Sequence, residues 1–373
     1  MKKITILALH LNYGGVEKYI SSLCKMLEDE YEIELLVTYK CEPAFNFSDK
    51  IKINYLINEM PNKEKFKKYL KDKKFIKVLI EGIKSLKLLF LKEYLNIKSI
   101  KNINSDYIIT TRTFHNRLVG RYARKDITKI ATEHNYHNND DSYVQKLINS
   151  LKNYDYLVTV SKELMDYYKN KISNVKVIYI PNILDSLPNK KSDLNNNNII
   201  SIGRFSKEKD FTTLIRVFKG VKERIKNAKL YLIGDGEEKE NIKELIKAYK
   251  LEKYVILPGF LSQVEMSKYL MNSKIYVMTS ITESFGLVLI EAMSYGLPCI
   301  AFDSASGARE LIENGKNGYL ISNRNIKKMC NKIVDLANNN DIINYSKEAL
   351  LISKKYLMGN IKKIWIDLLE EKL

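Results

Sequence analysis

Short apolar runs alternate with amphipathic stretches along almost the whole chain of 373 residues. Apolar runs of about four to eight residues bounded by turn residues predict buried strands, and apolar residues recurring every three or four positions predict helices. Regular alternation of the two predicts an α/β fold with two doubly wound domains, each built on a parallel sheet. The predicted strands are 4–10, 33–39, 107–111, 129–134, 156–161 and 175–182, then 198–204, 228–236, 254–260, 273–280 and 298–303, with later helices from Phe211, Glu237 and Gly286.

The sequence lacks the patterns of a membrane-spanning or disulfide-stabilised protein. No apolar run approaches the roughly 18 residues that a spanning helix needs. The start, MKKITILALHLNYGG, is similar to a signal peptide, but glycines end its short apolar part without a cleavage site, so we expect a strand over 3–10. We therefore expect a cytoplasmic protein. Four widely spaced cysteines without a Cys-x-x-Cys pair predict free buried thiols: Cys24, Cys41, Cys299 and Cys330.

The net charge of +18 is concentrated in one segment. Residues 61–101 contain 13 Lys against four acidic residues, which contributes +9. One interpretation is a codon bias toward Lys, Asn and Ile, with the lysines on solvated helices. Another is contact with an anionic membrane surface through the lysines, with most of the apolar residues between them packed on the sheet. Nucleic acid is the weakest interpretation, because no reading module is recognisable.

Candidate ligand-binding residues follow the predicted strands, since ligands of doubly wound sheets bind beyond the carboxyl ends of the strands. After the first strand, Gly14 and Gly15 precede a helix, and such a turn lets backbone amides approach an anion, although it is also a common structural turn. After the first strand of the second half, Gly203 is followed by Arg204 and Lys209. These two cations can clamp a diphosphate or be surface charges beside acidic neighbours.

The strongest local signal lies near 279–298. Glu283 precedes the helix predicted from Gly286, and the backbone amides of 285–288 would form an anion site at its N-terminus. Glu291 lies inside that helix among apolar residues, where a carboxylate needs a partner such as the vicinal hydroxyls of a ribose. The alternative, a capping Glu283 and a solvated Glu291, accounts less well for those apolar neighbours.

Together these residues resemble the retaining glycosyltransferases of family 4, of the type that builds bacterial cell-surface polysaccharides. Glu283-Ser284-Phe285-Gly286 followed by Glu291 is similar to the family's E-x-F-G-x-x-x-x-E signature. Further family motifs match in order: GGxE at Gly14, Gly15 and Glu17, a His at His134, PN-x-x-D at Pro181 to Asp185, G-R-x-x-x-x-K at Gly203, Arg204 and Lys209, and G-x-G at Gly234, Asp235 and Gly236.

The resemblance implies the GT-B fold, in which two Rossmann-like domains face each other across a cleft. The polar, turn-rich segment 189–198 is typical of a linker between them. We therefore expect an N-terminal acceptor-side domain at 1–188, with the basic segment 61–101. A nucleotide-sugar-binding domain follows at 189–355, and a C-terminal helix at 356–373 packs back on the first domain.

The resemblance also implies a retaining, metal-independent transfer of a sugar from a nucleotide sugar, expected to be a UDP-sugar, to a glycan acceptor. We expect that acceptor to be lipid-linked, in capsule or related polysaccharide synthesis, with the protein peripheral on the inner face of the membrane. No cofactor, metal or nucleic acid is expected. The implied catalytic residues are Glu283, His134, Arg204 and Lys209. The implied donor-binding residues are Gly14, Gly15, Gly203, Gly234, Phe285, Gly286, Leu287, Val288 and Glu291.

By the same resemblance, Arg204 and Lys209 would bind the diphosphate, Glu291 the ribose and Glu283 the sugar, with His134 beside that sugar. Where many relatives have G-G-x-P-E, this chain has SGARELI at 306–312. In the family this loop borders the nucleotide site, so the resemblance specifies the fold more closely than the identity of the donor. Two alternatives remain: a GT-B sugar-nucleotide epimerase, which would lack the E-x-F-G signature, and a non-catalytic glycan-assembly partner, against which the intact motif residues argue.

Overall fold

The computed structural model describes residues 1–61, 63–138 and 140–372. The chain divides into two compact units. Unit 1 comprises Met1–Val160 and Met165–Ile180, and unit 2 comprises Ser161–Leu164 and Pro181–Leu373. The predicted domain limits, the cleft and the packing of the C-terminal helix on the N-terminal domain stay predictions.

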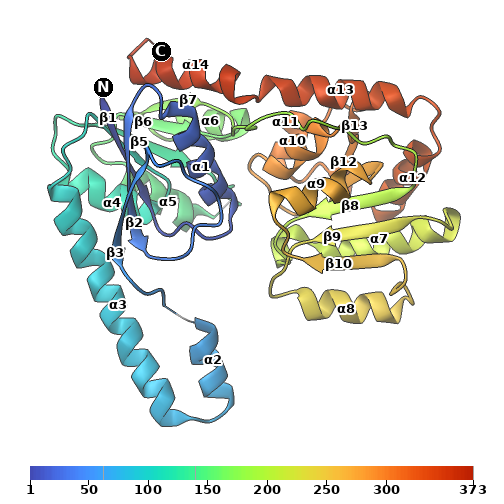
Figure 1. Cartoon of the computed structure of the whole chain (residues 1–373), viewed down its shortest axis with the longest axis horizontal. Coiled ribbons are helices and arrows are strands. Elements are labelled where there is room, and N and C mark those ends of the chain that lie inside the picture. The colour runs from blue at the N-terminus through green and yellow to red at the C-terminus, as the bar shows by residue number, and fades with distance from the viewer. Residues whose placement is uncertain (62, 139, 373) are drawn as a thin grey trace. The chain divides into compact units, whose positions relative to one another are not determined.

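Unit 1 is built on a seven-stranded parallel sheet in the order β3-β2-β1-β4-β5-β6-β7 (Figure 1). Its central strands are apolar on both faces because helices cover both sides of a parallel sheet. The elements are β1 (Lys3–Ala8), α1 (Gly15–Leu27), β2 (Glu32–Tyr39), β3 (Lys52–Ile57), α2 (Lys63–Lys71), α3 (Phe75–Lys101), β4 (Tyr107–Thr110), α4 (Thr113–Tyr122), β5 (Thr128–Glu133), α5 (Asp141–Ser150), β6 (Tyr156–Thr159), α6 (Lys162–Lys169) and β7 (Lys176–Tyr179).

Unit 2 repeats this plan with a six-stranded parallel sheet in the order β10-β9-β8-β11-β12-β13. Its elements are β8 (Asn198–Ile202), the 3-10 helix η1 (Lys207–Lys209), α7 (Phe211–Arg224), β9 (Lys229–Ile233), α8 (Lys239–Ala248), β10 (Val255–Gly259), α9 (Gln263–Met271), β11 (Ile275–Met278), α10 (Leu287–Ser294), β12 (Cys299–Phe302), α11 (Ser306–Leu311), β13 (Gly318–Ile321), η2 (Ser322–Arg324), α12 (Ile326–Ala337), α13 (Ile342–Lys355) and α14 (Met358–Leu369).

Both sheets reverse their strand order once, between β1 and β4 in unit 1 and between β8 and β11 in unit 2. At such a switch point the connections leave toward opposite faces of the sheet, so a crevice opens beyond the carboxyl ends of the two central strands. The loops after these strands carry most of the predicted site residues. The doubly wound α/β prediction is therefore confirmed, and each unit has one such switch point.

The predicted strands are confirmed in both halves, with differences at their ends and two additions. β3 and β13 were not predicted, because β3 is a half-buried edge strand and β13 has only four residues. The segment at 189–198 has no helix and no strand before Asn198, as expected. It is nevertheless held in unit 2, since the backbone N–H of Ser192 donates to the carbonyl oxygen of Tyr295 at 2.9 Å. The four cysteines are free, and Cys41 is only half-buried rather than buried.

The expectation that most apolar residues of the basic segment pack on the sheet is wrong. Of seven apolar residues that lie between the lysines, only Leu88 is buried, in a small cluster with Tyr39 and Ile57. The exposed ones are Phe75, Ile76, Leu79, Ile80, Leu89 and Phe90. The reason is the register of α3, which turns these residues away from β3 and α4. Figure 1 shows α2 and the first half of α3 extending beyond the sheet of unit 1. Residue 62 of this segment lies outside the described residues.

No helix in the described part of the chain is both long and apolar enough to cross a membrane.

Candidate functional site

The loops after β8 and β11 meet at the carboxyl edge of the sheet of unit 2, because these two strands are neighbours. This brings Lys209 and Glu283, 74 positions apart, into an ion pair between Nζ and Oε2. Only 26% of the Lys209 side chain and 19% of the Glu283 side chain are exposed. A largely buried charge needs a partner, and each of these residues supplies one for the other. The structure thus brings together two of the predicted residues.

Glycines shape the floor of this edge. Gly234 has φ of 137°, and a Cβ atom there would lie 2.0 Å from the carbonyl oxygen of Gly203. A side chain at Gly234 would therefore force the turns after β8 and β9 apart. Close backbone packing thus explains the predicted Gly234. A Cβ atom on the predicted Gly203 would make only ordinary contacts, the nearest 3.5 Å from the Phe211 ring.

The loop from Glu283 to Gly286 is fixed from below. Phe285 is 1% exposed and packs edge-on against Tyr356, with ring centroids 5.3 Å apart. The backbone N–H of Gly307 donates to the carbonyl oxygen of Glu283 at 3.0 Å. A Cβ atom at Gly307 would lie 2.0 Å from the carbonyl oxygen of Phe285, so the glycine of the SGARELI segment is required for this contact.

Gly286 is the N-cap of α10 and adopts a left-handed conformation with φ of 84°. The N–H groups in the first turn of a helix have no acceptor within it, and they carry the positive end of the helix dipole. Leu287 and Val288 occupy that turn, as predicted. Glu291 lies one turn further along α10 and is half-buried, and the Ser294 hydroxyl donates to its carbonyl oxygen at 2.6 Å. The sequence correctly placed these residues on one helix.

Arg204 is oriented differently from Lys209. Its guanidinium pairs with Glu237, with 3.1 Å between Nη2 and Oε2, and 72% of its side chain is exposed. The pair is a solvent-exposed ion pair of little energetic weight. The predicted two-cation clamp is therefore only half assembled, with Lys209 in the site and Arg204 at its rim.

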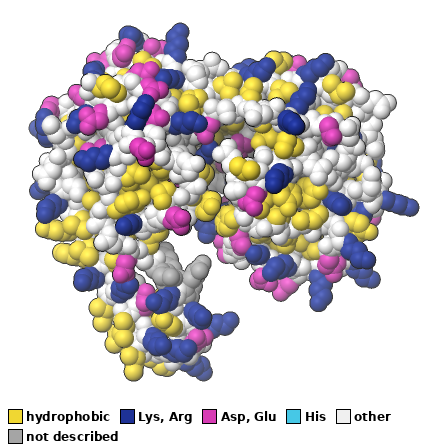
Figure 2. All heavy atoms as spheres, in the orientation of Figure 1, with side chains coloured by type: hydrophobic (Ala, Val, Ile, Leu, Met, Phe, Trp, Pro, Cys, Tyr) yellow, Lys and Arg dark blue, Asp and Glu magenta, His cyan; other side chains and the backbone are white. Residues whose placement is uncertain are grey.

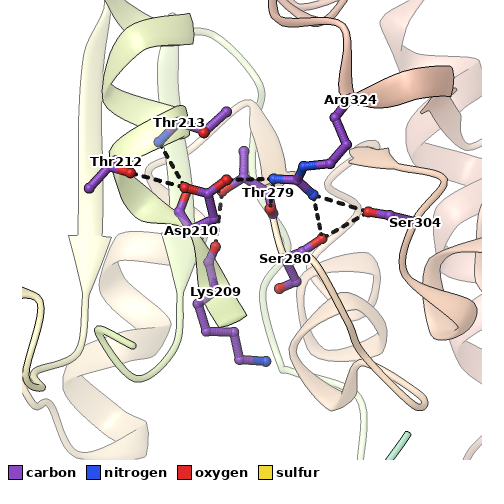
Figure 3. Close-up of polar contacts among 8 residues, drawn as sticks. All are labelled: Lys209, Asp210, Thr212, Thr213, Thr279, Ser280, Ser304 and Arg324. Carbon is purple, nitrogen blue, oxygen red and sulfur yellow. Dashed lines mark hydrogen bonds and ion pairs between the residues drawn. The ribbon is translucent and has the colours of Figure 1, made fainter. Parts of the chain in front are cut away.

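An arginine that the motifs did not include supports the site from behind (Figure 3). Nη2 of Arg324 donates to Asp210 Oδ2 at 2.6 Å and to the carbonyl oxygen of Thr279 at 2.9 Å. Nη1 donates to the carbonyl oxygen of Ser280 and to the hydroxyl of Ser304, both at 3.0 Å. One side chain thus ties together the loops that follow β8, β11 and β12.

This network controls the position of Lys209. The Thr279 hydroxyl donates to the carbonyl oxygens of Lys209 and Asp210 at 3.2 and 3.0 Å. Asp210 also caps α7, since its Oδ1 accepts from the backbone N–H of Thr213 at 3.2 Å. Asp210 and Arg324 both have positive φ, at 46° and 49°. Strained backbone of this kind is retained where the surrounding contacts over-determine it. Sequence reasoning missed Arg324, because nothing in its local sequence marks it.

In unit 1, the loop after β1 is organised by Glu17, which is 4% exposed. Its Oε1 accepts from Arg112 Nη2 at 2.7 Å and lies 3.6 Å from His10 Nδ1. A Cβ atom on Gly14 would lie 2.1 Å from Glu17 Oε2, so the first glycine leaves room for this carboxylate. A Cβ atom on Gly15 would meet nothing of the chain within 4 Å. Packing therefore explains Gly14 and leaves Gly15 unexplained.

His134 follows β5 at the same edge of the sheet of unit 1. Its Nε2 lies 2.9 Å from the Thr132 hydroxyl, and its ring contacts that of Tyr19, with centroids 4.3 Å apart. Burial lowers the pKa of His134 to about 3, so the ring is neutral at pH 7. The predicted His134 can therefore exchange hydrogen bonds there without carrying charge.

Glu133, directly before His134, is a buried carboxyl that the motifs also missed. Its Oε2 accepts from the Tyr143 hydroxyl at 2.8 Å, and its Oε1 from the backbone N–H of Asn135 at 2.6 Å. Burial raises the pKa of Glu133 to about 7 in spite of these bonds. The predicted residues lie in both units: Gly14, Gly15 and His134 in unit 1, and the others in unit 2.

Residues 185–350 match the family model described as glycosyl transferases group 1. This span contains Arg204, Lys209, Glu283, Gly286 and Glu291. The chain therefore carries a group 1 glycosyltransferase domain, and the protein is a glycosyltransferase.

Two curated relatives are similar over most of the chain. The amylovoran biosynthesis glycosyltransferase AmsD of Erwinia amylovora is 27% identical over 372 residues, covering 96% of this chain and 96% of its own. The N-acetylgalactosamine-N,N'-diacetylbacillosaminyl-diphospho-undecaprenol 4-alpha-N-acetylgalactosaminyltransferase of Campylobacter jejuni is 26% identical over 351 residues, covering 88% of each chain.

Among solved structures, Staphylococcus aureus TarM, in complex with Fondaparinux, alpha-GlcNAc-glycerol and UDP, superposes with a TM-score of 0.80. The match covers 99% of this chain and 100% of that chain at 18% identity. At this identity the likeness concerns the fold, and it confirms the prediction of two Rossmann-like sheets of the GT-B class.

We predict that Arg324→Met lowers both stability and transfer. The change leaves Asp210, only 18% exposed on its side chain, without its cation, which costs about 2 kcal/mol of unfolding free energy. Lys209 should then lose its fixed position. At temperatures well below unfolding, the KM for the donor should therefore rise by at least the factor by which kcat falls. Thermal unfolding and initial rates measure the two effects.

Arg224→Met is the control, because Arg224 is an exposed arginine of the same unit, at the end of α7, where it donates to Asn331 Oδ1 at 2.7 Å. Arg324→Lys should restore part of the stability while keeping the raised KM, since an ammonium group cannot reach all four acceptors. An Arg324→Met enzyme with wild-type kinetics would show that the network has no bearing on Lys209.

We predict that Gly15→Ala lowers transfer without lowering stability. An added methyl group meets nothing of the chain, and Ala in a helix is more stable than Gly by up to about 1 kcal/mol. If a donor approaches this backbone, the methyl group displaces it, and kcat/KM should fall by on the order of tenfold or more. Gly359→Ala, which also meets nothing within 4 Å, should change neither rate nor donor affinity. Equal activity of both variants would exclude donor approach at Gly15.

Proposed function

We propose that this protein is a retaining, metal-independent glycosyltransferase of family 4. In this proposal it transfers a sugar from a UDP-sugar to a lipid-linked glycan acceptor during synthesis of a cell-surface polysaccharide. The observation that carries the proposal is the Lys209–Glu283 pair at the switch point of unit 2, beside the N-terminus of α10. A fixed cation and aimed backbone amides at one edge are what a leaving diphosphate requires.

The chemistry follows from charge. Breaking the bond between a sugar and a diphosphate places negative charge on the leaving phosphate and positive charge on the sugar ring. Lys209 and the amides of Leu287 and Val288 would stabilise the phosphate, because preorganised donors aimed at developing charge lower the barrier. Glu283, paired with Lys209 in the structure, would turn to the sugar hydroxyls once the diphosphate engages the ammonium group.

The remaining roles are those of the family motifs. Arg204 would swing from Glu237 to the diphosphate, which its exposure permits at low cost. Glu291 would accept hydrogen bonds from the ribose. Gly15 would let the backbone of unit 1 approach the donor, and the neutral His134 would hydrogen-bond the sugar.

Retention and the UDP donor are supported by the relatives. The C. jejuni enzyme is named for forming an alpha linkage, and TarM was crystallised with UDP and an alpha-linked sugar. An alpha product from an alpha-linked nucleotide sugar means that the anomeric configuration is kept. We infer attack by the acceptor on the face that the diphosphate leaves, with the departing phosphate oxygen taking the proton of the acceptor hydroxyl.

The acceptor class is proposed on similar grounds. The C. jejuni relative is named for acting on a sugar carried by diphospho-undecaprenol, and AmsD is named for amylovoran biosynthesis. A lipid-linked acceptor places the reaction at a membrane surface. We therefore propose a cytoplasmic enzyme that is peripheral on the inner face of the membrane.

The products of the reaction distinguish a glycosyltransferase from the two alternatives, an epimerase and a non-catalytic assembly partner. An epimerase would convert the nucleotide sugar into its epimer without releasing UDP, and an assembly partner would consume no donor. Incubation with UDP-sugars should instead release UDP, faster when an acceptor is present. Recovery of an epimerised UDP-sugar would contradict the proposal.

We predict that Lys209→Ala lowers transfer by about 100- to 1,000-fold, the usual effect of removing one donor to developing charge. The fold should persist, since Asp210 and Arg324 still hold the loop. Lys207→Ala is the matched control, because Lys207 is an exposed lysine of the same short helix η1. The rate of UDP release measures the transfer activity of both variants. Equal rates for the two would show that Lys209 does not bind the diphosphate.

We predict that transfer persists in excess EDTA, because the positive groups at the diphosphate belong to the protein. Initial rates before and after chelation, and after adding Mg²⁺ or Mn²⁺, provide the measurement. A rate that collapses in EDTA and returns with the metal ion would assign the leaving-group charge to a metal instead.

A further inference from the structure

Helix α3 carries a row of exposed apolar side chains, which we name the α3 stripe. Its residues are between 53% and 76% exposed, although single exposed apolar residues are the usual case on a soluble surface. Figure 2 shows hydrophobic side chains along the outer edge of the part of unit 1 that α2 and α3 form. The α3 stripe consists of Phe75, Ile76, Leu79, Ile80, Ile83, Leu86, Leu89, Phe90 and Tyr94.

The spacing of the α3 stripe is helical. Leu79, Ile83, Leu86 and Phe90 follow one another at intervals of four, three and four residues, which places them on one face. On a surface helix this face normally packs on the core. In α3 it faces outward over more than four turns, from Phe75 to Tyr94.

The opposite face of α3, which packs on unit 1, combines apolar and polar residues. Its buried residues are Leu88 and Ile100 together with Glu81 and Asn96. Asn96 Oδ1 accepts from the Thr38 hydroxyl at 3.3 Å, and Glu81 lies 3.9 Å from Lys65 of α2. The helix therefore buries Glu81 and Asn96 beside Leu88 and Ile100, and it exposes the apolar residues of the α3 stripe. Its orientation is fixed by specific contacts on that buried face, so the exposed face is available to a partner.

Lysines border the α3 stripe. Lys77, Lys84 and Lys87 are exposed along one edge. On the other side α2 packs near Gly82, where a Cβ atom would lie 3.8 Å from the Phe66 ring, and α2 adds more exposed lysines. Figure 2 shows basic side chains around the lower part of unit 1.

Acidic residues neutralise only part of the charge of this region. Among the described side chains, Lys84 pairs with Glu59, Lys74 with Asp72, Lys65 with Glu81 and Arg117 with Glu93. Residues 61–101 nevertheless contain 13 Lys against four acidic residues. An apolar face edged by lysines complements a surface that is apolar below and negative at its boundary. A bilayer with anionic headgroups has that composition, whereas a second copy of this chain would set the two lysine-rich edges against each other.

We propose that the α3 stripe inserts among the lipids of an anionic membrane leaflet, with the bordering lysines at the headgroups. This inference deepens the proposed function, because it specifies how the enzyme reaches a lipid-linked acceptor. The use of the insertion rests on the proposed function, whereas the insertion itself rests on the side chains of α3. The physical contact is made by apolar side chains, and the lysines add to it. This differs from the expectation that lysines alone make the contact.

The test uses the full chain and sedimentation with vesicles of phosphatidylcholine alone or mixed with phosphatidylglycerol. The wild type should bind the mixed vesicles, more weakly as salt increases, and bind neutral vesicles less. A triple variant, Ile83→Gln, Leu86→Gln and Phe90→Gln, should lose binding by on the order of 100-fold. Gln keeps the helix propensity, so α3 should remain folded.

The matched control removes three apolar side chains of similar exposure from unit 2: Val264→Gln, Ile343→Gln and Leu351→Gln. It should bind vesicles as the wild type does. A charge variant, Lys71→Glu, Lys77→Glu and Lys87→Glu, should weaken binding to mixed vesicles and leave the weak binding to neutral vesicles unchanged.

Insertion itself can be observed by fluorescence. The sequence has one tryptophan, Trp365, which is fully buried. In a Phe90→Trp variant, lipids brominated along the acyl chains should quench the new fluorescence. The fluorescence of an Ile343→Trp variant should not be quenched.

UDP release from the donor alone separates this proposal from the proposed function. The stripe variant should keep the wild-type rate, since none of its three residues lies in the site. Vesicle binding without any transfer would leave the insertion standing and contradict the enzyme assignment. Two results would overturn the insertion: unchanged vesicle binding by the stripe variant, or lipid-independent dimers of the wild type that the same variant abolishes, which would assign the stripe to a second copy.

Discussion

The reversal of strand order in a parallel sheet is the constraint on which the candidate site depends. Because β8 and β11 are neighbours and both end at the same edge, the loops that follow them meet there although they are far apart in sequence. Lys209 and Glu283 become partners for that reason. The same reversal between β1 and β4 places the Glu17–Arg112 pair at the corresponding edge of unit 1.

Both edges hold charge in paired form. Lys209 pairs with Glu283, Arg204 with Glu237 and Arg112 with Glu17. A half-buried cation without a partner would be costly, so Lys209 and Arg112 are each kept next to a carboxylate, whereas Arg204 is exposed to solvent. Binding of an anion at such an edge exchanges one partner for another, which costs less than stripping water from an unpaired cation. The Arg324 network provides the rigidity for this exchange, since it fixes the backbone at Lys209 and Asp210.

Helix α3 follows a different rule from the rest of unit 1. Elsewhere apolar residues are buried between helices and sheet, whereas α3 buries Glu81 and Asn96 beside Leu88 and Ile100 and exposes the apolar residues of the α3 stripe. The polar contacts with Thr38 and Lys65 decide this orientation. An apolar pattern in a sequence therefore predicts that a helix has an apolar face. Only the tertiary structure shows whether other parts of the chain bury that face.

The sequence by itself determined the two α/β units, most of their strands and the motif residues, because parallel strands are continuous apolar runs and glycine turns follow them directly. Gly234, Gly286 and Lys209 could be placed in this way from local pattern. The tertiary structure decided what depends on distant contacts: the tie of Arg324 to the loops after β8 and β11, the turn of Arg204 toward Glu237, and the outward face of α3. Local propensity fixes the elements, but side chains that meet from separate elements acquire their partners only when the sheets form.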